Sequence, residues 1–153
     1  MQKQPNSRMC FVCGMENPIG LKAFFYDDDD GRVIVKFTPR QEHQGYPGVV
    51  HGGIITALMD EVIGRVVTSL DTWAVTAKLE LKFRKPVPLG EELTIIGEMI
   101  RLRSRSFEAK GELRLADGTV AVEGYGVYVR LPDEEIERRR SELDFWEVVP
   151  DTE

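Results

Sequence analysis

Residues 48–65 read GVVHGGIITALMDEVIGR, in which a glycine pair precedes an apolar run that carries two adjacent carboxylates. At the helical period of 3.6 residues per turn, the apolar side chains of this run fall on one broad arc, which predicts a largely buried helix over 54–70. The residues expected on the buried arc are Ile55, Leu58, Met59, Val62, Ile63 and Val66. The rest of the chain is expected to pack around this helix.

The two carboxylates leave the buried arc on different sides. Glu61 lies four residues before Arg65, the favourable order for an i,i+4 ion pair, and this spacing predicts a salt bridge at the solvated rim of the helix. Asp60 has no such partner and lies on a stripe of small residues, where a ligand or another element can approach the backbone. Because a buried carboxylate without a partner is costly, Asp60 is the candidate for chemistry.

The start of the helix is the second candidate feature. Gly52 and Gly53 follow His51 directly, and the first amides of a helix lack intrahelical acceptors while the helix dipole favours negative charge. These amides can therefore form an oxyanion hole, although a tight turn into a helix would also use glycine. The histidine before the pair and the acid after it favour the oxyanion hole.

The spacing between the two candidate features constrains the assembly. Nine residues separate His51 from Asp60, which corresponds to about 13 Å along a helix. This distance is too long for both ends to contact one reacting carbonyl, so either one end is not catalytic or two chains cooperate. Two antiparallel copies of the helix, related by a twofold axis, would bring Gly52 of one subunit near Asp60 of the other.

Two motifs carry a family resemblance. The stretch 45–53, with Asp60 nine positions after His51, resembles the hotdog-fold acyl-CoA thioesterases of the PaaI-like group. The opening CFVCG at 10–14, followed by NPIGL at 17–21, is similar to the start of many members. The resemblance implies an α+β hotdog fold, an antiparallel sheet wrapped around one long central helix. It also implies hydrolysis of an acyl-CoA thioester by a homo-oligomer, a dimer or tetramer with shared active sites.

The resemblance also implies roles for individual residues. Asp60 matches the catalytic carboxylate, which acts as a general base on water or as a nucleophile on the thioester. The amides of Gly52 and Gly53 match the oxyanion donors, and His51 would orient the carbonyl or fix the helix start. Thr76 matches a hydroxyl that positions substrate or water. Strand alternation places Thr76 on a polar face, so it reaches the site only at the start of its strand or past a bulge.

Coenzyme A requires cations for its phosphates. Arg103 and Arg105 resemble the basic bend of many hotdog enzymes, and Arg84 is a weaker candidate for the same role. Val50, directly before the helix start, is assigned to the same substrate-binding group. An ordinary charged strand edge explains the arginines nearly as well, because arginine on an edge also limits aggregation.

Alternating or apolar segments predict strands at 21–26, 32–38, 75–84, 92–102, 107–115 and 119–131. The residues of the strand at 75–84 that are expected to face the core are Val75, Ala77, Leu79, Leu81 and Phe83. We divide the chain into an N-terminal Cys-x-x-Cys segment at 1–20, a hotdog domain at 21–132 and a charged tail at 133–153. Phe145 and Trp146 are candidate anchors for the tail.

Composition narrows the classes of partner and location. The length of 153 residues predicts one folded domain. A net charge of −6 and a pI near 5.1 argue against nucleic acid as the main partner. No apolar run approaches membrane-spanning length and no basic-then-apolar leader precedes Met9, so we expect a cytoplasmic protein without a membrane partner.

Cys10 and Cys13 have the spacing of a metal knuckle. A zinc site takes four ligands, however, and the chain has only two cysteines and two histidines, His43 and His51. A structural zinc would need a second chain, so a small knuckle or buried thiols is the favoured interpretation. We expect the active site to use neither a metal nor a cofactor.

Three other classes of protein are alternatives to the thioesterase. A hotdog hydratase would place a catalytic histidine opposite an acid, and neither His43 in a loop nor His51 before the helix is so placed. A structural dimerisation domain would leave Asp60 unexplained. The alternative is a non-catalytic acyl-CoA binding or sensing module, because a carboxylate beside an oxyanion hole shows a capacity for hydrolysis and not its rate.

Overall fold

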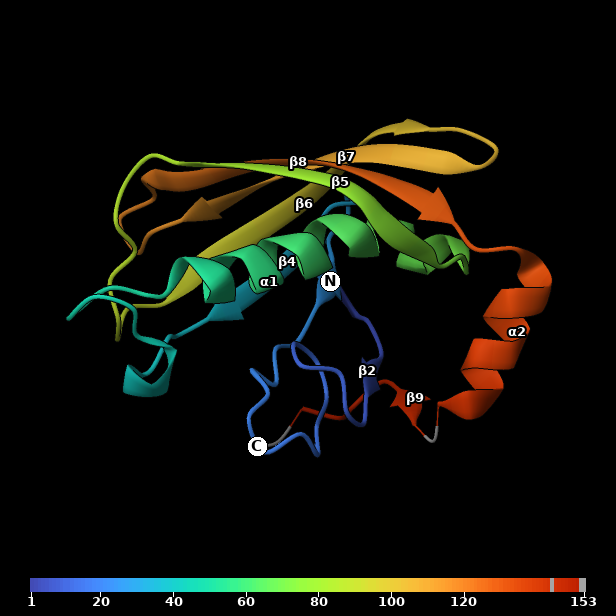
Figure 1. Cartoon of the computed structure of the whole chain (residues 1–153), viewed down its shortest axis with the longest axis horizontal. Coiled ribbons are helices and arrows are strands. Elements are labelled where there is room, and N and C mark those ends of the chain that lie inside the picture. Colours follow the sequence, from blue (N-terminus) through green and yellow to red (C-terminus); the bar gives the residue numbers. More distant parts are fainter. Residues whose placement is uncertain (144, 152–153) are drawn as a thin grey trace.

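The computed structural model of the chain describes residues 1–143 and 145–151. Within these residues, a seven-stranded antiparallel sheet has the order β1-β3-β4-β6-β7-β8-β5, and a helix, α1, lies along one face of it (Figure 1). The strands of this sheet are β1 (Gln2–Lys3), β3 (Tyr26–Asp27), β4 (Val33–Phe37), β5 (Ala74–Phe83), β6 (Leu93–Leu102), β7 (Ser106–Arg114) and β8 (Val120–Arg130). The helices are α1 (Gly52–Gly64), α2 (Asp133–Glu142) and the 3₁₀ turns η1 (Gln41–His43) and η2 (Arg65–Leu70).

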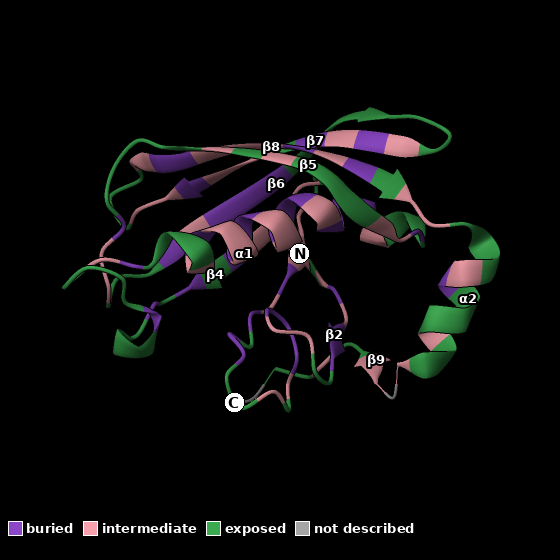
Figure 2. Cartoon of the chain, viewed as in Figure 1, coloured by how far each residue is buried: buried purple, intermediate pink, exposed green. Residues whose placement is uncertain are grey.

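The central helix differs from its prediction at both ends. It begins at Gly52 rather than residue 54, and the α-helical part ends at Gly64, after which η2 continues as a 3₁₀ helix. Figure 2 shows the buried side of α1 against the sheet. All of the residues predicted for the buried arc are buried, namely Ile55, Leu58, Met59, Val62, Ile63 and Val66. The helical period therefore identified the packing face correctly, although not the length of the helix.

A row of glycines in the sheet allows α1 to pack closely. Gly97, Gly111 and Gly124 are cross-strand neighbours on β6, β7 and β8. A Cβ atom at Gly97 would lie 2.7 Å from the carbonyl oxygen of Val62, and one at Gly111 would lie 2.8 Å from a side-chain carbon of Ile63. The helix therefore packs directly on the backbone of the sheet. Side chains at these glycine positions would push the helix away from the sheet.

Strand β5 is an edge of the sheet, and its faces differ from the predicted alternation. Val75 and Phe83 are 51% and 52% exposed and Ala77 is exposed too, so the prediction that these three face the core was wrong, whereas Leu79 and Leu81 pack against it. The pairing of β5 with β8 shifts between Thr76 and Lys78, and such a bulge reverses the alternation, so Val75 lies on the opposite face from Leu79 and Leu81. Phe83 shares the face of Leu79 and Leu81 but lies at the end of the strand, where it is left exposed. Residues 21–25, predicted as strand, form no strand, and Lys22 has a left-handed backbone with φ 53°.

The two ends of the chain pack together on the side of α1 away from strands β5, β7 and β8 (Figure 1). Strand β2 (Asn6–Ser7) pairs with β9 (Trp146–Glu147), and α2 carries the chain from the sheet to this position. The Trp146 ring packs edge to face on the Trp73 ring, with the ring centroids 5.7 Å apart, which confirms Trp146 as an anchor of the tail. In the described part of the chain, no helix is both long and apolar enough to cross a membrane.

We predict that Gly97→Ala destabilises the protein by about 1–3 kcal/mol, the usual range for overpacking a tightly packed core. The added methyl group would meet the backbone of α1, which can move only if the whole helix shifts. Urea unfolding followed by circular dichroism measures the change. Glu98→Ala, at the exposed neighbouring position, is the control and should change the free energy of unfolding by less than about 0.5 kcal/mol. Equal stability of the two variants would contradict the close packing of helix on sheet.

Candidate active site

Asp60 lies in the third turn of α1, and two hydroxyl groups hold its carboxylate. Thr76 Oγ1 donates to Oδ1 over 2.8 Å, and the hydroxyl of Tyr128 donates to the same oxygen over 3.1 Å. The other oxygen, Oδ2, accepts no hydrogen bond from the described residues. Thr76 lies near the start of β5 and immediately before its bulge, which is where strand alternation required it to be to reach the site. The carboxylate is thus oriented with one oxygen left for chemistry.

Tyr128 was missed by sequence reasoning. Its ring is 2% exposed and stacks on Phe107 with centroids 4.9 Å apart. A Cβ atom at Gly126 would lie 2.5 Å from this ring, and one at Gly64 would lie 3.1 Å from it. Burial, and then the charge of Asp60, raise the pKa of Tyr128 well above its usual range, so its hydroxyl stays a donor at neutral pH. Strand β8 also contains Tyr125, and its sequence gave no signal that separated the buried Tyr128 from this second tyrosine.

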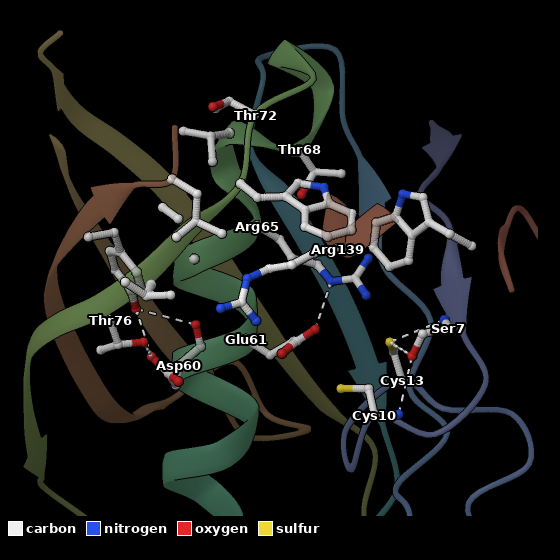
Figure 3. A pocket seen from close by; sticks show the side chains of 18 of the residues that line it. Ser7, Cys10, Cys13, Asp60, Glu61, Arg65, Thr68, Thr72, Thr76 and Arg139 are labelled. Atoms are coloured by element: carbon white, nitrogen blue, oxygen red, sulfur yellow. Dashed lines mark hydrogen bonds and ion pairs between the residues drawn. The ribbon is translucent and has the colours of Figure 1, made fainter. Parts of the chain in front are cut away.

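A cavity of about 360 Å³ opens beside Asp60. Its walls come from α1, η2, the start of β5, the end of β8 and both terminal segments (Figure 3). Asp60, Thr76 and Tyr128 line one side, and the apolar lining includes Val67 and Trp146. The cavity therefore combines an oriented carboxylate with apolar walls, the usual composition of a small-molecule site.

The helix start is built differently from the predicted pair of free amides. His51 is the N-cap of α1, and its Nδ1 accepts the hydrogen bond of the Gly53 amide over 2.8 Å. The Gly52 amide donates to none of the described residues. His51 thus fixes the helix start, one of its two predicted roles, and Gly52 is the free donor of the glycine pair in the single chain. His43, in the preceding loop, is buried and accepts the Arg40 amide with its Nδ1.

The two candidate features lie at opposite ends of α1. Gly52 borders a second hollow, of about 710 Å³, whose lining includes Val50, Phe83 and Arg84 at the end of β5. Asp60 contacts Thr76 near the start of the same strand. The Gly52 amide and the Asp60 carboxylate therefore lie apart in a single chain. This separation is the one that the sequence spacing predicted.

The predicted coenzyme A cations lie in two places. Arg84 lines the hollow beside Gly52, and its guanidinium nitrogen lies 2.9 Å from a carboxylate oxygen of Glu123. Arg103 and Arg105 lie in the bend between β6 and β7, where Arg103 pairs with Glu108 at 3.4 Å. This bend is at the end of the sheet that carries Thr76 and Tyr128, because Ser106 pairs with the neighbour of Tyr128 on β8.

Arg65 is buried and Glu61 is half-buried, so the prediction of a solvated or rim pair was wrong for the arginine. Arg65 Nε donates to Glu61 Oε1 over 3.0 Å, and Arg65 is only 5% exposed. Its guanidinium also donates to the Pro5 carbonyl over 2.8 Å and lies 4.0 Å from the ring centre of Phe25. Burial raises the pKa of Glu61 although Arg65 opposes the shift. The terminal segments cover this side of α1, and this tertiary contact is why the solvated pair predicted from helix spacing was wrong.

The two cysteines are free thiols at the wall of the same cavity. Cys13 is buried, and its sulfur lies 3.3 Å from the Ser7 hydroxyl. Hydrogen bonding from the Cys10 thiol, helped by the charge of Arg65, lowers the pKa of Cys13 to about 5, whereas the pKa of Cys10 is raised. Cys13 is therefore the thiol of the pair that ionises first.

Comparison with known proteins identifies the family. Residues 47–122 match the thioesterase superfamily. Acyl-coenzyme A thioesterase THEM4 of Bos taurus is 28% identical over 126 residues, which cover 81% of this chain and 52% of THEM4. The chain thus spans about half the length of this curated relative.

Solved structures agree with the sequence match. Protein RHA08564, a thioesterase superfamily protein, is 34% identical and has a TM-score of 0.75 over 80% of this chain and 63% of that chain. The E. coli PaaI protein is 19% identical, with a TM-score of 0.68 over 73% of this chain and 81% of PaaI, and so shares the fold. These similarities confirm the predicted α+β architecture of a sheet around one helix. The chain belongs to the thioesterase superfamily and has its hotdog fold.

Proposed function

We propose that this chain is an acyl-CoA thioesterase, which hydrolyses an acyl-CoA thioester to a carboxylate and free CoA. The observation that carries the proposal is the Asp60 carboxylate, with Oδ1 held by two hydroxyl donors and Oδ2 free beside a partly apolar cavity. The similarity to THEM4, named an acyl-coenzyme A thioesterase, supports the same activity.

The proposed reaction uses Asp60 to drive attack on the thioester carbonyl. As a general base, its free oxygen takes a proton from water while the water oxygen bonds to the carbonyl carbon. The carbonyl oxygen becomes an oxyanion, which the Gly52 amide and the positive end of the helix dipole stabilise. The carbon–sulfur bond then breaks, and the CoA thiolate leaves and takes up a proton. As a nucleophile, Asp60 would instead form an anhydride that water hydrolyses, and oxygen-18 labelling of the carboxylate in a single turnover separates the two routes.

The proposed site is shared between two subunits. Gly52 and Asp60 lie eight residues apart on α1, about 12 Å along its axis, so one chain cannot place both on one carbonyl. Strand β5 is an edge strand of ten residues with Val75 and Phe83 exposed at its two ends, and it lies beside α1. A twofold axis through this edge would set the Gly52 hollow of one subunit against the Asp60 cavity of its partner.

Within this site, the acyl group would occupy the cavity beside Asp60 and the phosphates of CoA would contact arginines. Arg103 and Arg105 lie at the Asp60 end of the sheet, whereas Val50 and Arg84 lie beside the Gly52 amide. In the antiparallel dimer both groups would border one composite site, so a single CoA can contact them together.

We predict that Asp60→Asn abolishes thiol release from acyl-CoAs that the wild type hydrolyses. The amide is isosteric with the carboxylate but can neither accept a proton from water nor attack a carbonyl. The measurement is thiol release from a panel of short, long and aromatic acyl-CoAs, with folding of both proteins confirmed by circular dichroism. Asp29→Asn, in the exposed acidic turn, is the matched control and should retain wild-type turnover.

The same panel tests the alternative function. A wild type that binds acyl-CoA but hydrolyses no member of the panel would identify the chain as a binding or sensing module. Hydrolysis that Asp60→Asn retains at the wild-type rate would show that another residue carries the reaction.

We predict that Tyr128→Phe lowers kcat with little change in KM. A hydrogen bond to a charged group is worth about 1.5–3 kcal/mol, which corresponds to about a tenfold to hundredfold loss of rate when the carboxylate loses its orientation. The stacked ring stays on Phe107, so the fold is retained. Tyr26→Phe, which removes an exposed hydroxyl bonded to Asp151, is the control. An unchanged kcat in Tyr128→Phe would show that Thr76 alone suffices to orient Asp60.

We predict that mixing Asp60→Asn chains with Gly52→Pro chains restores activity that neither variant has alone. Gly52 is the first residue of α1, where proline fits and removes only the free amide hydrogen. His51 has φ −59° and ψ 134°, which a following proline tolerates. Each heterodimer should have one intact site and about half the activity of a wild-type dimer. Purified heterodimers without activity would place the whole site within one subunit.

A further inference from the structure

The two thiols and the half-buried carboxylate of Glu61 form a cluster that the proposed hydrolysis does not use. The sulfur atoms of Cys10 and Cys13 and a carboxylate oxygen of Glu61 all lie within 4.8 Å of one another. Figure 3 shows the cysteines, from the N-terminal segment, on the side of the cavity where Glu61 extends from α1. The residues thus come from two elements that are distant in sequence and meet only in the folded chain.

These three ligand types and their spacing match a zinc site. Zinc bonds to thiolate sulfur at about 2.3 Å and to carboxylate oxygen at about 2.0–2.2 Å, so tetrahedral ligand atoms lie about 3.5–3.8 Å apart. The observed cluster, with ligand atoms up to 4.8 Å apart, therefore needs to contract by about 1.3 Å at most. The ligands line the cavity, which leaves room for a water molecule as the fourth ligand. Soft thiolate ligands favour zinc over magnesium or calcium.

The loop that carries the cysteines is held in a defined shape. The Gly14 amide donates to the Cys10 carbonyl over 2.7 Å, and a Cβ atom at position 14 would lie 2.4 Å from that oxygen. The buried Asn6 side chain donates to the carbonyls of Cys13 and Ala23 over 2.8 and 3.0 Å. Both thiols are thus positioned by contacts that do not depend on a metal.

Charge compensation favours a bound dication. Two thiolates and one carboxylate carry three negative charges, which zinc and the Arg65 guanidinium together neutralise. Arg65 binds Glu61 only through Oε1, and Oε2 accepts no hydrogen bond from the described residues, so it is free to face a metal. The outward side of Cys13 is covered by Ser7, whose amide lies 3.5 Å from the sulfur. Arg65 therefore neutralises part of the negative charge of the metal site, while Oε2 of Glu61 stays available as a metal ligand.

We propose that Cys10, Cys13 and Glu61 bind one zinc ion, which clamps the N-terminal segment to α1 one residue away from Asp60. The cysteines and histidines of the sequence are too few for a zinc site within one chain, and the fold adds the Glu61 carboxylate as a further ligand. The proposal is independent of catalysis, because the clamp is structural and its ligands exclude Asp60.

The test uses the full chain, stripped with EDTA in the presence of a reductant and then dialysed against zinc. We expect one zinc per chain by elemental analysis, protection of both thiols from N-ethylmaleimide, and a melting temperature several degrees above that of the stripped protein. Cobalt in place of zinc should give thiolate-to-metal charge-transfer absorption, which reports the sulfur ligands directly.

Variants identify the ligands. Cys10→Ser and Cys13→Ser should each lose stoichiometric zinc and the cobalt absorption band, and Glu61→Gln should weaken zinc binding at least tenfold. Asp60→Asn is the matched control, since it removes the neighbouring carboxylate of the same helix and should bind zinc as the wild type does. A stripped wild type that takes up no zinc, or zinc that Cys10→Ser retains at full stoichiometry, would overturn the proposal. Because the readout is metal and not turnover, an inactive protein can still pass this test.

Discussion

Helix α1 lies in direct contact with the backbone of the sheet, and the rest of the structure depends on this contact. The row of Gly97, Gly111 and Gly124 removes the side chains that would otherwise separate helix and strands. Close approach places the helix backbone at the level of the Tyr128 ring, so that the tyrosine hydroxyl reaches Asp60. The orientation of the candidate catalytic carboxylate therefore follows from how closely the helix packs.

In the same packing, the two candidate catalytic groups lie toward opposite ends of α1. An unpaired amide lies at Gly52, where the helix dipole is positive, and an oriented carboxylate lies at Asp60 two turns later. Because a straight helix holds these groups apart, the single chain carries the two halves of the proposed site in separate places. The edge strand β5, which borders both, is the surface through which a second copy could complete them.

The side of α1 away from the sheet has a different role. There the terminal segments cover Glu61 and Arg65, and the Arg65 guanidinium links the helix to Pro5, Phe25 and Trp146. Adjacent acids on one helix thus have separate environments, since Asp60 faces hydroxyl donors while Glu61 faces a cation and two thiols. The proposed hydrolysis and the proposed metal clamp rest on these two neighbouring positions.

The sequence by itself determined the local features of this protein. The 3.6-residue period gave the buried face of α1, and helix geometry separated His51 from Asp60, because both depend only on residue spacing. Tertiary structure alone decided which groups meet across the chain. Tyr128 reaches Asp60 from 68 residues away, a bulge after Thr76 leaves Val75 on the exposed face of β5, and the terminal segments cover Glu61 beside Cys10. These contacts depend on strand register and on how the ends of the chain pack, and hydrophobic periodicity encodes neither.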